Sequence, residues 1–276
     1  MRTATISRGA VFTWVLPAAL LLLTGAAPPA APQTPAVEQF ERTIPLPSGG
    51  TFSLSNINGS IEIEGWDRSE VQISARKFTA GTAEDLQQVG IEVSFASGNV
   101  SVVTHYPQGS GVDVNVEFRV RVPARVHLAS VSTVNGSVTV HDVSGEGSLV
   151  AVNGNVLLAR GAGIFSGRAT NGNVSLELLS LDGGVAPAAD SARAASRAGI
   201  SAQTINGSVV VALPADAGAE LEARTQNGDF TSDLPLLAHS SAAGRIIRGR
   251  VGSGGPPLFL RTVNGSIRLR ISRPLV

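Results

Sequence analysis

Hydrophobic and polar residues alternate along most of the chain after residue 50, and the alternation is centred on a recurring Asn-Gly pair. Apolar residues tend to lie six and four positions before the Asn and three and five after it, as Phe52, Leu54, Ile61 and Ile63 do around the first pair. Side chains alternate between two faces along a β-strand, so each pair is expected to separate two strands that bury one face each. The pairs are Asn58-Gly59, Asn135-Gly136, Asn153-Gly154, Asn171-Gly172, Asn206-Gly207, Asn227-Gly228 and Asn264-Gly265.

The spacing of these pairs predicts a repeat architecture. Asn135, Asn153 and Asn171 lie 18 residues apart, and the later gaps of 35, 21 and 37 residues approximate two, one and two such periods. A steady period is typical of a single-stranded parallel β-solenoid, with Asn-Gly at a corner of each rung. Asn-Gly between alternating strands is also the strongest hairpin signal, which would give an antiparallel β-sandwich or meander.

The residues two positions before each Asn favour the solenoid over the hairpins. They would point inward, and a narrow interior needs small side chains that can hydrogen-bond from rung to rung. These residues are Asn56, Thr133, Ala151, Ala169, Thr204, Thr225 and Thr262.

Residues 66–128 depart from the repeat. Their alternation predicts strands over 71–75, 91–95, 100–104 and 112–122, the last ended by Pro123, and Thr82 is expected to cap a short helix that reaches Val89. The Gly-, Ala-, Ser- or Pro-rich stretches 182–197 and 249–257 are expected to be loops between rungs.

The N-terminus is typical of an exported protein. Arg2 and Arg8 precede an apolar run over 10–23 and then small residues, which predicts a signal peptide over 1–26. Cleavage after Ala36 and an uncleaved anchor are the alternatives. The run is shorter than the roughly 20 apolar residues of a spanning helix, so no stable membrane span is expected after cleavage.

The rest of the chain is then divided into a Pro/Ala-rich, disordered linker over 27–38 and one β-repeat domain over 39–276. The expected location is the periplasm or the cell surface. The absence of cysteine excludes a disulfide framework and a lipidated cysteine. The near-neutral charge argues against nucleic acid as a partner.

No catalytic, cofactor-binding or metal-binding residue is expected. His105, His127, His141 and His239 are too widely spaced to suggest zinc ligands. Asp182-Gly183-Gly184 lacks the carboxylate series of a calcium loop, and serine-nucleophile and phosphate-loop motifs are missing.

Carboxylates are the remaining candidates for chemistry. Glu62 and Glu64 share one strand face, and Asp113 and Glu117 share another. A polysaccharide lyase or hydrolase would need acids from adjacent rungs to converge in a groove, whereas later rungs carry Leu157 or Arg268 at the outward positions.

Two surface features have both a functional and a structural interpretation. Several pairs read Asn-Gly-Ser, which matches a glycosylation acceptor, but a turn followed by a small polar residue produces the same triplet. Trp66 is expected in an exposed turn that could contact a sugar, or alternatively as a cap on an open end of the stack.

The repeat motifs themselves resemble a known family. The segments at 58–63, 134–140, 170–176 and 263–269 read Asn-Gly-Ser-Ile-Glu-Ile, Val-Asn-Gly-Ser-Val-Thr-Val, Thr-Asn-Gly-Asn-Val-Ser-Leu and Val-Asn-Gly-Ser-Ile-Arg-Leu. They resemble the bacterial β-strand-repeat putative adhesin family called domain of unknown function 4097, over roughly residues 40–272. The resemblance implies an exported, solenoid-like protein with a proposed role in adhesion and no established catalytic residues.

The sequence therefore predicts an exported, non-enzymatic β-repeat protein that acts as an adhesin or as a binding or scaffold module of the cell envelope. Its expected partner is a cell-surface or envelope protein or a glycan. A carbohydrate-active β-helix enzyme is the first alternative. Self-assembly through the unpaired strand edges at the ends of the stack is the second.

Overall fold

The computed structural model describes residues 35–107, 109, 111–182, 199–240 and 246–272, which all belong to one unit, Thr34–Val276. The predicted signal peptide, residues 27–34 of the predicted linker and most of the predicted loop 182–197 lie outside the described residues. Ala36, Val37 and Glu38, the end of the predicted linker, belong to a strand. No helix of the described residues is long and apolar enough to cross a membrane.

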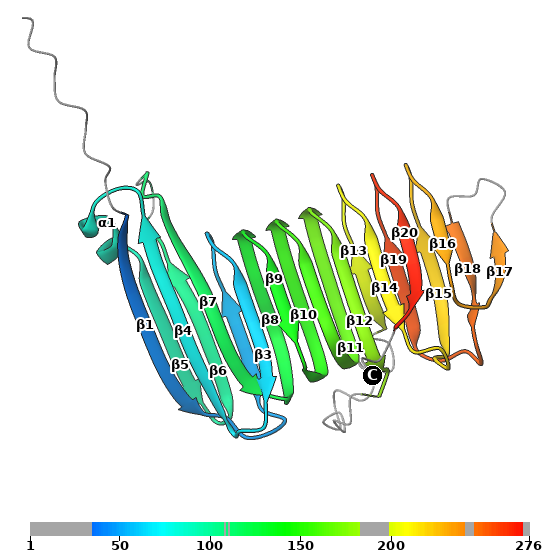
Figure 1. The fold of residues 1–276 in the computed structure, drawn as a ribbon, viewed down its shortest axis with the longest axis horizontal. Helices are drawn as coiled ribbons and strands as arrows, with labels where there is room; N and C mark the ends of the chain where they lie inside the picture. Colours follow the sequence, from blue (N-terminus) through cyan, green and yellow to red (C-terminus); the bar gives the residue numbers. More distant parts are fainter. Residues whose placement is uncertain (1–34, 108, 110, 183–198, 241–245, 273–276) are drawn as a thin grey trace, which may run out of the picture. The chain divides into compact units, whose positions relative to one another are not determined.

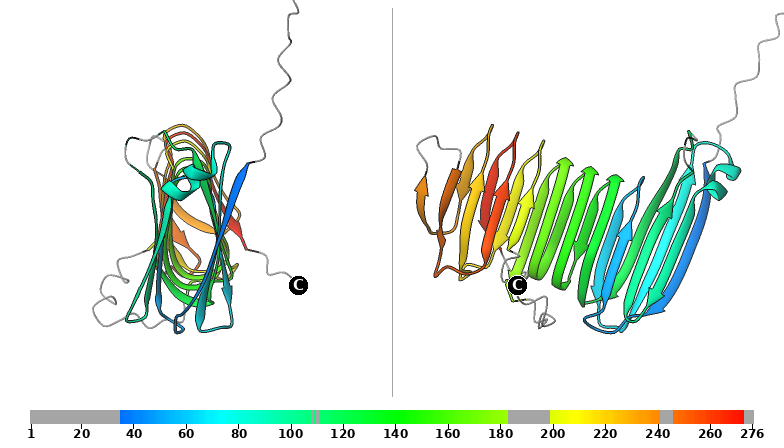
Figure 2. Two further views of the ribbon diagram at one scale, coloured as in Figure 1. Left: turned by 90° about the vertical axis from the view of Figure 1, so that its left-hand side faces the viewer. Right: turned by 180° about the vertical axis from the view of Figure 1, so that it is seen from behind.

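The fold is all-β, and its strands lie in two facing layers that we call sheet 1 and sheet 2 (Figures 1 and 2). In spatial order, sheet 1 contains β5 (Gly90–Ala96), β6 (Asn99–His105), β2 (Thr51–Ser55), β8 (Arg125–Asn135), β10 (Ser144–Asn153), the second half of β11 (Val156–Asn171), β13 (Ile200–Gln203), β19 (Pro257–Arg261), β15 (Ala219–Arg224), β18 (Ile246–Val251) and β17 (Leu236–Ser240).

Sheet 2 is ordered in the same way. It contains β1 (Ala36–Pro45), β4 (Glu70–Thr79), β7 (Val114–Pro123), β3 (Ile61–Trp66), β9 (Val138–His141), the first half of β11, β12 (Val174–Ser180), β14 (Val209–Leu213), β20 (Ile267–Ile271) and β16 (Phe230–Ser232).

Each Asn-Gly pair lies where the chain passes from sheet 1 to sheet 2, as between β8 and β9. The strands on either side of a pair do not pair with each other. They pair in parallel with the equivalent strands of the neighbouring rungs, so that Val156 lies opposite Val138 and Asn153 opposite Asn171, 18 residues apart. The antiparallel Asn-Gly hairpins of the alternative prediction are therefore not formed.

An uninterrupted parallel solenoid is not confirmed either, because the strand directions are mixed. At one end β1 and β7 are antiparallel to β4, and β5 is antiparallel to β6. At the other end β18 is antiparallel to both β15 and β17. Only β5 and β6, and β17 and β18, are consecutive in the chain, as in a hairpin, whereas β4 pairs with β1 and β7, and β15 with β18, across other strands of the sequence.

The last two repeats do not stack in chain order (Figure 1). Strands β19 and β20, which flank Asn264, lie between the rung of β13 and β14 and the rung of β15 and β16, which flank Asn227. Along the chain, β15 and β16 come first, the antiparallel strands β17 and β18 follow, and β19 and β20 come last. The distances between the Asn-Gly pairs in the sequence do not indicate this order.

The core lies between the two sheets and contains the residues that the alternation predicts. The inward pairs after six of the seven Asn-Gly units, such as Val156 and Leu158 or Ile267 and Leu269, are at most 1% exposed, whereas Phe230 and Ser232 after Asn227-Gly228 are only partly buried. The small residues two positions before each Asn are also buried. The threonines bond to the neighbouring rung as expected, since Thr262 Oγ1 donates to the carbonyl of Gly207 at 2.9 Å and Thr204 Oγ1 to that of Gly172 at 2.7 Å.

The segment 66–128 builds the first end of the stack. The predicted strands are β4, β5, β6 and β7, although β7 begins at Val114 rather than at residue 112 and includes Pro123. The predicted helix is α1 (Ala83–Gln88), with Thr82 as its N-cap in a capping box. The predicted loop 249–257 is shorter than expected, because β18 continues to Val251 and β19 begins at Pro257.

Candidate binding face

The outward positions of sheet 2 form two polar rows that cross the strands of the stack. Glu62 and Glu64 on β3 lie opposite Arg119 and Arg121 on β7. On their other side the rows continue on β9 with Thr139 and His141. Both rows exist because the Asn-Gly corners keep successive rungs in register, which stacks every second residue on the same side.

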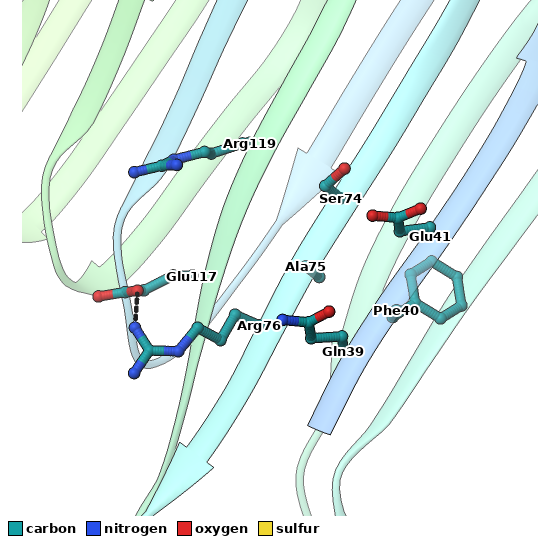
Figure 3. A pocket seen from close by; sticks show the side chains of 8 residues that line it. All are labelled: Gln39, Phe40, Glu41, Ser74, Ala75, Arg76, Glu117 and Arg119. Carbon is teal, nitrogen blue, oxygen red and sulfur yellow. Dashed lines mark hydrogen bonds and ion pairs between the residues drawn. The ribbon is translucent and has the colours of Figure 1, made fainter. Parts of the chain in front are cut away.

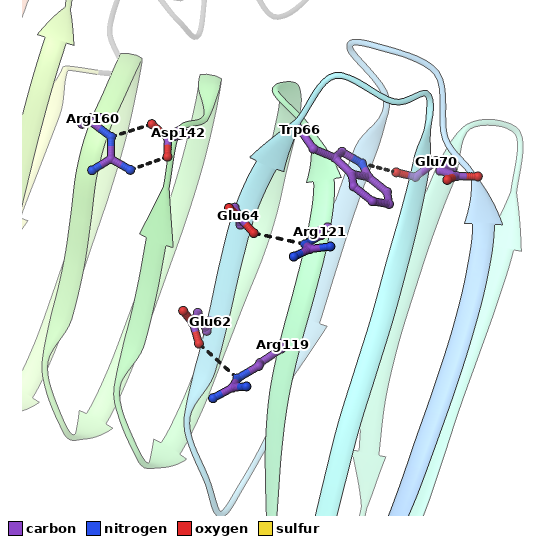
Figure 4. Close-up of polar contacts among 8 residues, drawn as sticks. All are labelled: Glu62, Glu64, Trp66, Glu70, Arg119, Arg121, Asp142 and Arg160. Carbon is purple, nitrogen blue, oxygen red and sulfur yellow. Dashed lines mark hydrogen bonds and ion pairs between the residues drawn. The ribbon is translucent and has the colours of Figure 1, made fainter.

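The first strands of this face carry cross-strand ion pairs (Figures 3 and 4). Arg119 Nε lies 3.4 Å from Glu62 Oε2, and Arg121 Nε lies 3.1 Å from Glu64 Oε2. Arg76 Nη1 lies 3.4 Å from Glu117 Oε2. All these side chains are largely exposed, so each pair contributes little to stability. Their effect is to neutralise the carboxylates of β3 and β7 locally.

Trp66 lies beside these pairs (Figure 4). Its indole Nε1 donates to the backbone carbonyl of Glu70 at 2.8 Å, and the guanidinium groups of Arg68 and Arg121 lie 4.9 and 5.9 Å from its ring centroid. The ring is half-buried at the end of β3, a strand that is paired on both sides. The prediction that Trp66 caps an open end of the stack is therefore wrong.

A shallow hollow of about 240 Å³ lies over β1, β4 and β7 on the same face (Figure 3). Gln39 and Glu41 of β1 line one side, and Arg76, Glu117 and Arg119 line the other. The hollow offers both signs of charge and amide groups, which suits hydrogen bonding to a polar ligand.

The carboxylates singled out in the sequence do not form a catalytic arrangement. Glu62, Glu64 and Glu117 each contact an arginine of a neighbouring strand. Asp113 lies outside the strands, just before β7, where its carbonyl accepts a hydrogen bond from Thr79. Three of these four carboxylates are thus engaged by an arginine.

The histidines are dispersed as the sequence indicates. His105 Nε2 lies 2.8 Å from Glu92 Oε2, and His127 Nδ1 lies 3.9 Å from Glu146 Oε2. His141 belongs to the outward row of β9, and the side chain of His239 lies outside the described part of the structure. In the part that is described, no group of three or more His, Asp or Glu side chains could hold a metal ion.

The Asn residues of the seven pairs form one continuous side-chain ladder. The order in the stack is Asn58, Asn135, Asn153, Asn171, Asn206, Asn264 and Asn227, and from Asn135 onward each Nδ2 donates to the Oδ1 of the preceding Asn at 2.7–2.9 Å. Parallel in-register strands place identical side chains one strand spacing apart, which is the geometry of an amide ladder. The interior amides are therefore occupied as both donor and acceptor.

The sequence did not indicate the hollow at the other end of this face. A second and larger hollow lies over β12, β14, β20 and β16, and Arg268 and Arg270 are in its lining. The alternation in the sequence places these arginines on the outward side of β20. The neighbours of β20 are β14 and β16 because the last two rungs do not stack in chain order.

No family model matches the chain, and no curated protein matches it. The resemblance to the adhesin family therefore stays a prediction. Among solved structures, the chain is similar to a putative cell adhesion protein of Clostridium sporogenes (11% identity, 84% of this chain and 99% of that chain, TM-score 0.42). It is also similar to a putative adhesin of Bacteroides fragilis (8% identity, 84% and 97%, TM-score 0.32). At these identities and TM-scores the likenesses carry no argument about function.

Proposed function

We propose that this chain is an exported, non-enzymatic β-repeat protein whose outward strand faces bind a partner at the cell surface or in the envelope. The observation that carries the proposal is the pairing of Glu62, Glu64 and Glu117 with arginines across neighbouring strands. Carboxylates engaged by arginines in this way are not paired with one another, as the acid and base of a glycosidase would be.

The repeat geometry supports the same proposal. Parallel-paired rungs joined by the Asn ladder form a rigid scaffold, and stacked repeats commonly present extended binding surfaces. We further propose that the parallel-paired rungs from β2 to β20 are a β-solenoid of the adhesin type, to which antiparallel end strands have been added.

Export can be tested on the full chain expressed in a bacterial host with its own N-terminus. We expect the product in the periplasm or the medium, with an intact mass that corresponds to a chain starting at Ala27. A cytoplasmic product of full-length mass would contradict export.

Binding and catalysis can be separated with the exported product. We expect it to bind intact bacterial cells or members of a glycan array, and to release no reducing or unsaturated ends from acidic and neutral polysaccharides. Release of such ends at a rate proportional to protein concentration would overturn the non-enzymatic proposal. Absence of binding to every cell type and glycan would count against a role as a binding module.

A further inference from the structure

We propose that the hollow around Arg268 and Arg270 on sheet 2 binds the carboxylates of an acidic polysaccharide. The hollow measures about 1030 Å³ and lies over four neighbouring strands, β12, β14, β20 and β16. The inference deepens the function proposed above, because it assigns a ligand class to one part of the binding face.

The two arginines differ from the others in the outward rows of sheet 2 in having no acidic partner. Within the described residues, the guanidinium groups of Arg268 and Arg270 make no ion pair and no hydrogen bond. At the other end of the same face, Arg119 and Arg121 are both paired with glutamates of β3. The donors of the C-terminal pair are therefore available to a ligand.

The register of the strands places short or uncharged residues beside most of this pair. On β14, Val210 lies opposite Arg268 and Ala212 lies opposite Arg270, and on β16 the residue opposite Arg268 is Thr231, so none of these offers a carboxylate. Asp233 follows Ser232, the partner of Leu269, and therefore lies on the Arg270 side of the hollow, but it forms no ion pair with that arginine. Because Val210 and Ala212 are short, they also leave space above the strand, which is the hollow itself.

The geometry fits carboxylates repeated along a chain. Arg268 and Arg270 are exposed and lie two residues apart on one strand, which separates them by about 7 Å along it. Each guanidinium can hold one carboxylate through two parallel N–H···O bonds. Two successive acidic groups of one polymer could thus be held at once.

The rest of the lining favours a sugar polymer over a phosphate polymer. Val210, Ala212 and Ile271 offer apolar contacts, and Ser175 and Thr231 offer hydroxyl groups. Glu177 and Asp233 also line the hollow and would accept hydrogen bonds from sugar hydroxyls. The same two carboxylates would repel any polyanion, and they would repel a polyphosphate or nucleic acid more than a uronate polymer, whose charges are one to a sugar.

The test measures binding of polygalacturonate to the exported product by calorimetry at low salt. Its fully methyl-esterified form is the uncharged control polymer, and inorganic polyphosphate is the control polyanion. We expect polygalacturonate to bind, its affinity to fall as salt is added, and both control polymers to bind at least tenfold more weakly. Equal binding of the esterified polymer, or tighter binding of polyphosphate, would overturn the assignment.

Substitutions then locate the site. Arg268→Gln and Arg270→Gln should each weaken binding about tenfold, since each removes a charge-assisted contact. Ala212→Glu should weaken it to a similar extent with both arginines intact, because it provides Arg270 with the cross-strand partner that β3 provides at the other end. Arg250→Gln removes an equal charge from the Arg250–Glu220 pair on sheet 1 and should leave binding unchanged.

The outcomes separate this inference from the broader function. If Arg250→Gln weakens binding as much as Arg268→Gln does, the effect is one of net charge and the site is wrong. If the protein binds cells or neutral glycans but not polygalacturonate, the inference fails and the binding function stands. If polygalacturonate binds at this hollow but no cell surface is recognised, the inference stands and the broader function fails.

Discussion

At the residue scale, the Gly of each pair is required by how closely the neighbouring rung approaches. A β-carbon added to Gly265 would lie 2.0 Å from the carbonyl oxygen of Gly207, and the φ of Gly265 is +150°. The same approach recurs along the stack, so that a β-carbon on Gly207 would lie 2.2 Å from the carbonyl oxygen of Gly172. Backbone atoms block any larger residue there, and a backbone cannot move aside as a flexible side chain can.

Gly265→Ala is therefore expected to lower the free energy of unfolding by about 3 kcal/mol, since it forces apart two rungs that are fixed on both sides. Gly90→Ala is the matched control, because nothing lies within 4 Å of its added β-carbon. Chemical denaturation monitored by circular dichroism measures both variants. Equal stabilities for the two would contradict the role of the close approach.

Tyr106 gives a second prediction at this scale, because it is the chain's sole tyrosine. Burial raises its pKa to about 12, and its hydroxyl donates to the carbonyl of Val114 at 3.1 Å. The folded state favours the neutral phenol, so this stabilisation is present below pH ~10 and is lost as the pH rises toward 12.

Stopped-flow absorbance after a jump to alkaline pH should show phenolate formation in the folded protein with a midpoint near 12. The same measurement in denaturant should give about 10. Tyr106→Phe should abolish the signal in both. A midpoint near 10 in the folded protein would show that the phenol is solvated.

At the scale of the elements, side-chain contacts at the corners connect neighbouring rungs in addition to the backbone hydrogen bonds between their strands. The Asn ladder does this where the chain leaves sheet 1. Asp142 and Arg160 do it near the ends of β9 and of the first half of β11, where Arg160 Nε donates to Asp142 Oδ1 at 2.6 Å and a second bond joins Nη2 to Oδ2 (Figure 4). Both residues have positive φ, of 56° and 53°, so the pair accompanies a tight reversal on both rungs.

The Asp142–Arg160 pair makes the stability of the folded chain depend on pH in the acidic range. The hydrogen bonds from Arg160 hold the pKa of Asp142 below its usual range. A lowered pKa means that the stabilisation is present above the unfolded value of about 3.9 and is lost as the pH falls through the folded value.

Wild type should therefore melt at a higher temperature than Asp142→Asn at pH 6, and the two melting temperatures should converge toward pH 2. The difference at pH 6 should be small because the ion pair is exposed. Asp216→Asn is the control, since within the described residues Asp216 has no ion pair. A gap between wild type and Asp142→Asn that stays constant across this pH range would contradict the account.

At the scale of the whole described unit, the order of the rungs determines which strands need which others as pairing partners. Strands β15 and β16 reach the rest of the stack through β19 and β20, which follow them in the chain. Strands β19 and β20, the last two described strands in the sequence, thus lie between other rungs of the stack. This differs from a linear repeat array, in which each repeat contacts its neighbours in the sequence.

A chain that stops after Ser240 tests this dependence. It lacks β18, β19 and β20, so we expect the amides of residues 219–232 to lose their protection from hydrogen exchange. The amides of residues 125–176, which pair among themselves, should keep theirs. Continued protection of 219–232 would mean that β15 and β16 pair directly with β13 and β14, as the order of the chain suggests.

The sequence by itself determined the strands that flank the Asn-Gly pairs and those of residues 66–128, their buried faces and the positions where the chain changes sheet, but it did not indicate β1, β17 or β18. Alternation at period two and the steric needs of an Asn-Gly corner are local, and they can be deduced from residues such as Val156, Leu158 and Gly172. Thr82 likewise indicated the start of α1 through its own capping interactions.

Only the tertiary structure decided which strands are neighbours. The rungs at Asn227 and Asn264 differ locally, since Phe230 and Ser232 occupy the positions that Ile267 and Leu269 occupy, but their order in the stack depends on how β17 and β18 return the chain. The antiparallel ends and the hollow around Arg268 and Arg270 follow from that pairing. A strand's pattern fixes which side chains face outward, whereas the partners of those side chains are set by contacts between residues far apart in the chain.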